Sequence, residues 1–254
     1  MTAATCKNCN SSLFGQYCSN CGQDREHHVS FSEIKKDFLD EAFDYDSRIF
    51  KTLKYLFSRP GFLTQQYWLG KRIKYLQPIR LYILASVIYY FINPLLRTTH
   101  SQFIIANKIV SKLIDAGHYE NIERIILDYG QEIELLLFTP LTGAILMLLY
   151  KSTGKPFLHH IIASVHLSSF IFIYLTIINI LMSLLNIAHP SIGIFYVFIP
   201  IYCVIMLRSI YNDSILKSLF KTVCIFLSVI LRNIFIFTIG YLISILINYP
   251  NFPM

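Results

Sequence analysis

The sequence has little charge and lacks the patterns of the common catalytic sites. Charged residues make up 15% of its 254 residues, against about a quarter in a soluble domain, and 54% of the residues are hydrophobic. The H-E-x-x-H signature of zinc proteases is absent, and Gly154-Lys155 lacks both the earlier glycine and the following Ser or Thr of a phosphate-binding loop. These absences favour a membrane protein without enzymatic activity.

The shortage of charge is confined to the residues after about 80, and the chain begins with a polar segment instead of the apolar core of a cleavable signal peptide. This asymmetry indicates a small cytosolic head on a polytopic membrane domain. We therefore predict an all-α membrane protein in three parts: a zinc ribbon over 1–28, amphipathic and juxtamembrane helices over 29–78, and a membrane domain over 79–254.

Four cysteines near the N-terminus form two C-x-x-C pairs separated by eight residues. Two tight turns at this separation can each supply two thiolates to one tetrahedral zinc ion, and Asn20 and Gly22 tolerate the backbone of such a turn. Disulfides would need an oxidising compartment, and a redox dithiol would need a βαβ context that the sequence lacks. We predict one structural Zn²⁺ per chain, bound by Cys6, Cys9, Cys18 and Cys21.

The stretch between the two cysteine pairs indicates what the ribbon binds. It contains Leu13, Phe14 and Tyr17, and the nearby cations are Lys7 and Arg25. Phosphate contacts require clustered Lys and Arg, so nucleic acid is not the expected ligand. A closed four-cysteine site also leaves no open position for catalysis at the metal. We therefore expect the ribbon to bind a protein partner.

Two amphipathic helices are predicted between the ribbon and the membrane domain. The first begins at the Ser30–Glu33 capping box, and its carboxylates at 40–46 form a solvated face or, alternatively, a site for a divalent ion. Ser47 can cap the second, which is basic on one side and ends at Pro60-Gly61. Such a helix lies on the membrane surface or packs against the spans.

Cations and aromatic residues alternate over 60–82, immediately before an apolar run. Ammonium and guanidinium groups suit lipid headgroups, and Tyr and Trp rings suit the boundary between headgroup and hydrocarbon. We predict that this stretch contacts membrane lipids with anionic headgroups. Its lipid-interface residues are Tyr67, Trp68, Lys71, Arg72, Lys74, Tyr75 and Arg80.

The first third of the chain carries three motifs in a fixed order. They are Tyr17-Cys18-x-x-Cys21-Gly22-Gln23, then Arg59-Pro60-Gly61, then Tyr67-x-x-Gly70-Lys71-Arg72-x-x-Tyr75-x-x-Pro78. With these motifs the chain resembles a bacterial family of uncharacterised membrane proteins that have an N-terminal zinc ribbon and several transmembrane helices. The resemblance covers roughly residues 5–95. It implies an integral membrane protein with a ribbon head, and it implies no reaction.

The apolar residues after 79 form about five predicted transmembrane helices, whose lengths suit a hydrocarbon core of about 30 Å. Pro140 and Gly143 are candidate kinks in the second helix. Residues 98–134 carry two amphipathic stripes and are expected to form an extracytoplasmic helical segment. The predicted spans are about 79–96, 135–150, 160–185, 191–209 and 222–247.

Loop charges predict the orientation in the membrane. Lys and Arg concentrate in the head and in the loops near 151–155 and 208–221, whereas 98–134 holds more carboxylates than cations. Because cytoplasmic loops carry the excess of Lys and Arg, we expect a cytoplasmic N-terminus and an extracytoplasmic C-terminus in a bacterial inner membrane. A reducing cytosol also suits the unpaired cysteines of the ribbon.

Two sets of polar residues within the predicted spans are candidates for a ligand site. Arg232, beside Asn233, lies inside the fifth apolar run, where a charge costs about 2.5–3.5 kcal/mol unless it meets a ligand or snorkels to an interface. His159, His160 and His166 lie near the start of the third span, where they could form a metal or proton site or meet headgroups.

Three functions are compatible with these features. The first is a non-enzymatic adaptor or assembly factor that binds a protein partner through its cytosolic ribbon. The second is a transporter or channel for a small solute or lipid, with a polar site near Arg232. The third is an intramembrane enzyme acting on a lipid-linked substrate. We favour the adaptor, because the sequence contains neither repeat symmetry nor paired broken helices.

Overall fold

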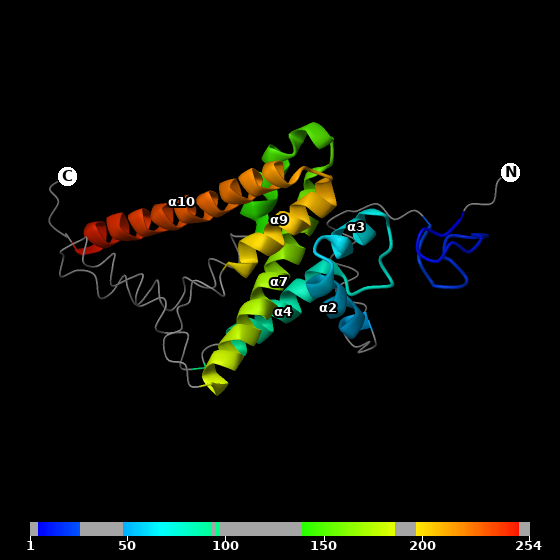
Figure 1. Cartoon of the computed structure of the whole chain (residues 1–254), viewed down its shortest axis with the longest axis horizontal. Coiled ribbons are helices and arrows are strands. Elements are labelled where there is room, and N and C mark those ends of the chain that lie inside the picture. The colour runs from blue at the N-terminus through cyan, green and yellow to red at the C-terminus, as the bar shows by residue number, and fades with distance from the viewer. Residues whose placement is uncertain (1–4, 26–47, 93–94, 97–138, 186–196, 249–254) are drawn as a thin grey trace.

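The computed structural model of the protein describes residues 5–25, 48–92, 95–96, 139–185 and 197–248. Within these residues the chain is helical, as predicted, and the extended pairing consists of two isolated β-bridges, Thr5 with Ser12 and Tyr17 with Asp24. Both bridges lie in the N-terminal segment 5–25, called the ribbon below. The ribbon and the far end of the last helix lie at opposite ends of the molecule (Figure 1).

The first described helix, α2 (Arg48–Ser58), ends before Pro60-Gly61, as the sequence predicts. Gly61 then adopts a left-handed φ of 85° and precedes α3 (Phe62–Trp68). A Cβ atom at Gly61 would lie 2.9 Å from Ile210 Cγ1, so the glycine also allows this elbow to approach α9 (Phe198–Tyr211). Helix α3 itself was not predicted, because seven residues are too few for a clear periodicity.

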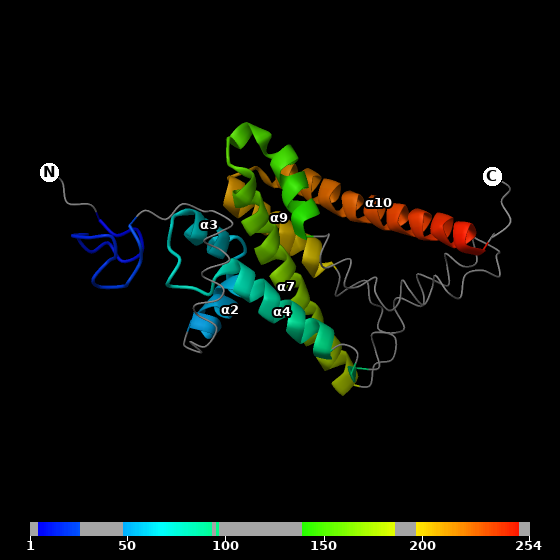
Figure 2. The ribbon, with the colours of Figure 1, turned by 180° about the vertical axis from the view of Figure 1, so that it is seen from behind.

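Helices α4 (Pro78–Ile92) and α7 (Phe157–Leu184) pack along each other and form one side of the bundle (Figure 2). The helix Thr139–Leu149 and the 3₁₀ turn η2 (Lys151–Thr153) lead into α7. Gly143, a candidate kink, lies within this helix. A Cβ atom there would lie 3.2 Å from Ile161 Cα, so the glycine allows the helix to approach α7 closely.

The last two helices form a hairpin. Asn212, with a left-handed φ of 55°, ends α9, and α10 (Ile215–Asn248) packs back against it. Helix α10 has 34 residues, a length of about 51 Å at 1.5 Å per residue. It includes the predicted span of about 222–247 and begins before it, at Ile215, because its first two turns continue the same apolar spacing. Pro200 lies in the first turn of α9, where proline is tolerated.

The core lies where α2, α7 and α9 meet. The rings of Phe170 and Tyr202 stack with their centroids 3.5 Å apart, and the Tyr202 hydroxyl donates a 2.8 Å hydrogen bond to the Leu56 carbonyl oxygen. This bond ties the end of α2 to the bundle. The surrounding buried side chains are Leu63, Leu81, Leu146, Ala163, Leu167, Cys203, Met206, Leu207, Ile210 and Ile225.

Among the described residues one helix, α7, is long and apolar enough to cross a membrane, and α4, Thr139–Leu149 and α9 are shorter apolar helices. Each of the five predicted spans thus overlaps a helix, while the number of spans stays a prediction. The predicted helix from Ser30, the carboxylates at 40–46 and the segment 98–134 lie outside the described residues.

Candidate functional site

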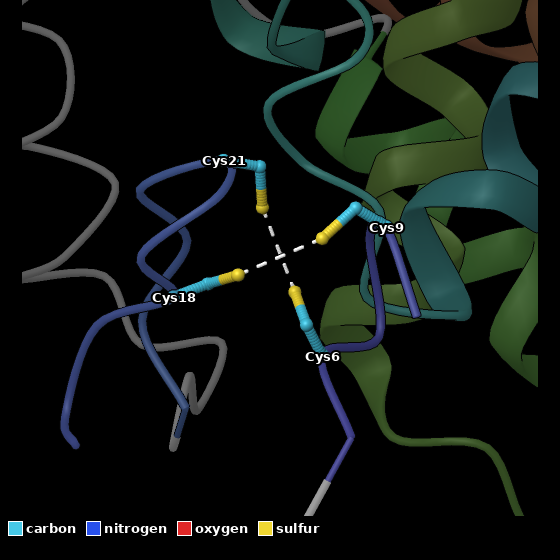
Figure 3. Close-up of side chains that lie close together, drawn as sticks. All are labelled: Cys6, Cys9, Cys18 and Cys21. Carbon is cyan, nitrogen blue, oxygen red and sulfur yellow. Dashed lines mark hydrogen bonds between the residues drawn. The ribbon is translucent and has the colours of Figure 1, made fainter. Parts of the chain in front are cut away.

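The four cysteines of the ribbon point toward a common centre (Figure 3). The Sγ atoms of Cys6 and Cys21 lie 3.6 Å apart, as do those of Cys9 and Cys18, and all four ligand atoms lie within 4.8 Å of one another. A tetrahedral zinc ion with Zn–S distances of about 2.3 Å would separate its sulfurs by about 3.8 Å. The arrangement is therefore compatible with a metal site, as predicted.

The thiols are free, because a disulfide requires an S–S distance of about 2.05 Å. The Ser11 hydroxyl, whose Oγ lies 3.2 Å from Cys9 Sγ, and the Ser11 backbone lower the pKa of the Cys9 thiol from 9.0 to about 6. A thiol with such a pKa is largely a thiolate at neutral pH, which is the form that binds metal. These observations argue against the disulfide alternative within the ribbon.

The two cysteine turns have the same backbone geometry. Cys6 N–H donates to Ser11 O at 2.8 Å and Cys18 N–H donates to Gln23 O at 2.9 Å, each closing one turn. Asn10 and Gly22 follow the second cysteine of each pair and adopt left-handed φ angles of 63° and 72°. The sequence predicts this role for Gly22 and Asn20; Gly22 has it, whereas Asn20 donates its side-chain amide to Ser11 Oγ. Asn10 and Gly22 each follow the second cysteine of a pair, and this shared position in the sequence would have predicted the left-handed backbone at both residues.

Gln23 attaches the ribbon to the loop between α3 and α4. Its side-chain amide donates a 2.6 Å hydrogen bond to the Gly70 carbonyl oxygen, and its Oε1 accepts a longer one, 3.4 Å, from the Arg72 backbone N–H. Gly70 has a φ of 83°, and a Cβ atom there would lie 3.2 Å from Lys7 Cδ on the ribbon. With 4% of its surface exposed, Gln23 is buried in this contact.

Helix α3 fastens the same region to the bundle. The Thr64 hydroxyl and His166 Nδ1 share a buried 2.9 Å hydrogen bond, and the Gln65 side-chain amide donates to the Ser209 carbonyl oxygen. The Trp68 indole N–H donates a 3.2 Å hydrogen bond to the His159 carbonyl oxygen. Helix α3 therefore contacts both α7 and α9.

The stretch 60–82, which is predicted to contact lipid headgroups, also makes contacts within the protein, because α3 turns it back onto the bundle. Tyr75 is buried, with edge contacts of 5.7 Å to the Tyr55 ring and 5.9 Å to the Phe62 ring. Other predicted interface residues also contact protein, since Arg72 lies 5.0 Å from the Tyr67 ring centroid and Lys74 lies 5.9 Å from that of Tyr75. Lys71 and Arg80 are half-buried, and the Lys71 ammonium group donates a hydrogen bond to Gln66 Oε1.

The three histidines of α7 do not converge on one site. His166 bonds to Thr64, His160 Nδ1 lies 2.7 Å from the Tyr211 hydroxyl, and the His159 ring packs 5.4 Å from the Trp68 ring. The side chains of His160 and His166 are buried between helices. Each imidazole thus has its own neighbour within the bundle.

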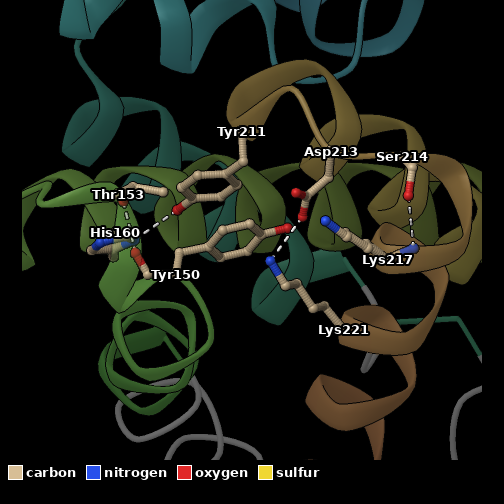
Figure 4. Close-up of polar contacts among 8 residues, drawn as sticks. All are labelled: Tyr150, Thr153, His160, Tyr211, Asp213, Ser214, Lys217 and Lys221. Carbon is tan, nitrogen blue, oxygen red and sulfur yellow. Dashed lines mark hydrogen bonds and ion pairs between the residues drawn. The ribbon is translucent and has the colours of Figure 1, made fainter.

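A polar cluster that the sequence did not predict lies where Thr139–Leu149, α7, α9 and α10 meet (Figure 4). The Tyr150 and Tyr211 rings stack at 3.5 Å, and Lys221 Nζ lies 3.5 Å from the Tyr150 ring centroid. The same ammonium group bonds to Asp213 Oδ2 at 2.8 Å. The sequence feature that could have predicted this cluster is Asp213, the one carboxylate in the otherwise cationic stretch 208–221.

The charge state of Asp213 follows from two opposed effects. Burial favours the neutral carboxyl group, but the hydrogen bond from Lys221 and the neighbouring Tyr150 hydroxyl outweigh it and lower the pKa of Asp213. The carboxylate is therefore ionised at neutral pH and pairs with Lys221.

Arg232 lies near the middle of α10 and has 8% of its surface exposed. Its side chain is therefore buried within the protein, and its role as a ligand site stays a prediction. The side chain of Asn233 lies outside the described part of α10.

Residues 46–90 match a family model described as a protein of unknown function (DUF3667). The match covers α2, α3 and α4, which include the Arg59-Pro60-Gly61 motif and the stretch 60–82. No curated protein and no solved structure matches this chain. The chain is thus similar to an uncharacterised family over residues 46–90, which include helices of the bundle and the loop that binds the ribbon.

Proposed function

We propose that this protein is a membrane-embedded adaptor that binds a protein partner through a zinc-loaded ribbon. The observation that supports this proposal is the exposure of two aromatic residues, with Phe14 90% exposed and Tyr17 63% exposed, on the same small ribbon. Aromatic side chains are enriched at the centres of protein interfaces. Gln23 holds the ribbon against the α3–α4 loop, so these rings are presented from a fixed base.

Four thiolates favour zinc as the bound ion. Soft sulfur ligands in tetrahedral geometry are typical of structural zinc, and a closed set of four cysteines leaves no position for substrate. Cys6, Cys9, Cys18 and Cys21 would hold the ion, and its role would be to fold the ribbon.

Membrane placement is supported by apolar side chains that face outward at helical spacing. Scattered exposed apolar residues are normal in soluble proteins, but continuous stripes on three helices are not. With the charge distribution described above, we propose a multi-pass protein of a bacterial inner membrane with a cytoplasmic N-terminus and an extracytoplasmic C-terminus. The exposed residues include Ile83, Val87 and Phe91 on α4, Ile177, Leu181 and Leu184 on α7, and Val223, Leu227, Ile230, Leu231, Ile234 and Phe235 on α10.

Site-specific photocrosslinking in living cells tests the adaptor role. A photoreactive phenylalanine at position 14 or 17 should give a discrete crosslinked protein, which disappears in a Cys18→Ser, Cys21→Ser background. The matched control carries the same group at Phe50, which is 81% exposed on α2 and away from the ribbon. Equal crosslinking at Phe14 and Phe50, or a band that persists without the cysteines, would contradict the proposal.

A second candidate, a transporter or channel for a small solute or lipid, is supported by the burial of Arg232 within an apolar helix. Arg232→Leu separates it from the adaptor. A transporter should lose solute or lipid flux in proteoliposomes while it inserts normally, and Arg232→Lys should restore flux in part, because lysine lacks the planar guanidinium fork. An adaptor should keep its crosslinks at Phe14 in both variants.

A further inference from the structure

Three aromatic rings lie in a row at the end of the bundle nearest the ribbon attachment. Tyr150 stacks on Tyr211 at 3.5 Å, and Tyr211 contacts Trp68 edge-on at 5.7 Å. Each end of the row carries a lysine: Lys221 lies 3.5 Å from the Tyr150 centroid, and Lys155 lies 4.4 Å from the Trp68 centroid. The two ends therefore have the same cation-over-ring arrangement.

The two lysines differ in their counter-charge. Lys221 bonds to the Asp213 carboxylate, whereas the Lys155 ammonium group has no carboxylate partner within the described residues. Those residues contain two carboxylates in all, Asp213 and the ribbon residue Asp24. A half-buried ammonium group over an aromatic ring, with no anion beside it, is an uncompensated positive charge.

Two further nitrogen-bearing side chains belong to the Trp68 end. The His159 ring packs on Trp68 at 5.4 Å, and Arg72 lies four residues after Trp68, in the loop that follows α3. Arg72 Nε and His159 Nδ1 are buried, and within the described part of the chain neither has a hydrogen-bond partner. Buried nitrogen atoms of this kind are almost always satisfied in native proteins, so each indicates a missing hydrogen-bond partner: an acceptor for Arg72 Nε, and an acceptor or a donor for His159 Nδ1, depending on its tautomer.

We infer that Lys155 and His159, which both pack on Trp68, form a binding site for a phosphate group together with Arg72 in the loop after α3. A guanidinium fork, an ammonium point charge and an imidazole nitrogen are the groups that proteins use to bind phosphate oxygens. The phosphate belongs either to the headgroup of an anionic lipid or to a free phosphate-bearing solute. This site lies outside the exposed face of the ribbon and does not depend on the adaptor role.

Trp68 allows a direct test, because it is the single tryptophan of the chain and part of the proposed site. Full-length protein in a neutral maltoside detergent is titrated separately with short-chain phosphatidylglycerol and with inorganic phosphate, and the midpoint of the Trp68 fluorescence change is measured. We expect a saturable change with at least one probe. Lys155→Gln and Arg72→Gln should each raise the midpoint about tenfold, as expected for loss of one charge-assisted contact.

Lys151→Gln is the matched control, since Lys151 is an exposed lysine on the neighbouring turn η2 and should leave the midpoint unchanged. Lys155→Arg should keep binding, and circular dichroism confirms that each variant is folded. Saturation by the lipid alone assigns a headgroup site, and saturation by inorganic phosphate assigns a solute site. No saturation with either probe, or equal midpoints for Lys155→Gln and Lys151→Gln, overturns the inference. Crosslinking at Phe14 should be unaffected by Lys155→Gln. A failure of the phosphate-site inference can therefore be distinguished from a failure of the adaptor proposal.

Discussion

The ribbon and the helical bundle are held together by different forces. In the ribbon the buried apolar cluster consists of Cys6, Leu13 and Cys18, so the metal-binding thiols are most of its core. In the bundle a continuous core surrounds the stacked rings of Phe170 and Tyr202. Segments below about 40 residues rarely bury enough surface to fold without a metal or disulfides. The ribbon should therefore depend on metal, and the bundle on apolar packing.

Removal of the metal should have the largest effect and should be confined to the ribbon. Structural zinc contributes about 10–16 kcal/mol of apparent binding free energy in small zinc-dependent folds, so Cys18→Ser with Cys21→Ser should unfold residues 5–25. Elemental analysis should find about one zinc per chain in the wild type and none in the variant. Protease cleavage within 5–25 should rise, while the helical circular dichroism signal stays unchanged. Wild-type protein without zinc would contradict the assignment of the ion.

Truncation in the bundle core should have the opposite pattern. Phe170→Ala removes a fully packed ring and should lower the free energy of unfolding of the bundle by about 3–5 kcal/mol. Its zinc content should remain that of the wild type, because the ribbon does not share this core. Thermal melting in detergent measures the effect. Phe50→Ala, at a position 81% exposed, is the control and should change stability by less than about 0.5 kcal/mol.

The ion pair at the hairpin should have a smaller, pH-dependent effect. Lys221→Met leaves the Asp213 carboxylate without its partner and should destabilise the bundle by about 1–2 kcal/mol, since both side chains keep some contact with water. The folded-state pKa of Asp213 lies below its ordinary value of 3.8, so this contribution is present above that pH and is lost as the pH falls through the folded-state pKa.

Melting curves of wild type and Lys221→Met should therefore converge in acid. Lys217→Met, a nearby lysine that forms no ion pair with Asp213 among the described contacts, is the control and should have a smaller effect. A constant difference between the wild type and Lys221→Met down to about pH 2 would assign the effect to lost packing on the Tyr150 ring instead.

The features that the sequence predicts well are those decided by local spacing. Two C-x-x-C pairs bring four sulfurs together because each tight turn fixes its own two thiols, and Pro60-Gly61 ends α2 because neither residue continues a helix. Apolar runs likewise predict helices, although α10 begins earlier than expected. In each case the cause lies within a few residues of the effect.

The features that the sequence does not predict depend on contacts between distant segments. The partner of His160 is 51 residues away, and Thr64 meets His166 from 102 residues away. The same rings that suit a membrane interface, Trp68 and Tyr75, also suit packing against a bundle, and composition does not distinguish the two environments. The protein contacts of these rings follow from the path of α3 across α7 and α9, which depends on distant segments.

The smallest expected effect concerns Gln23, which links the two regions. Gln23→Ala removes the hydrogen bonds to Gly70 O and from Arg72 N–H and should weaken the attachment of the ribbon by about 1 kcal/mol. Both regions should stay folded, with zinc content and bundle melting temperature unchanged. Hydrogen exchange at the Arg72 amide should become faster by about fivefold, because its acceptor is lost. Gln16→Ala, on the exposed side of the ribbon, is the control.

Gln23→Glu sharpens this prediction, because the two side chains have nearly the same shape. A carboxylate can still accept a hydrogen bond from the Arg72 N–H, but it cannot donate one to the Gly70 carbonyl oxygen. It would instead place a carboxylate oxygen against that carbonyl oxygen, where the side-chain amide now donates its 2.6 Å hydrogen bond. Glutamate should therefore detach the ribbon more than alanine does, with faster exchange at Arg72. If glutamate preserves the slow exchange of the wild type, the donated bond to Gly70 does not hold the ribbon, and the contact between Lys7 and Gly70 becomes the better explanation.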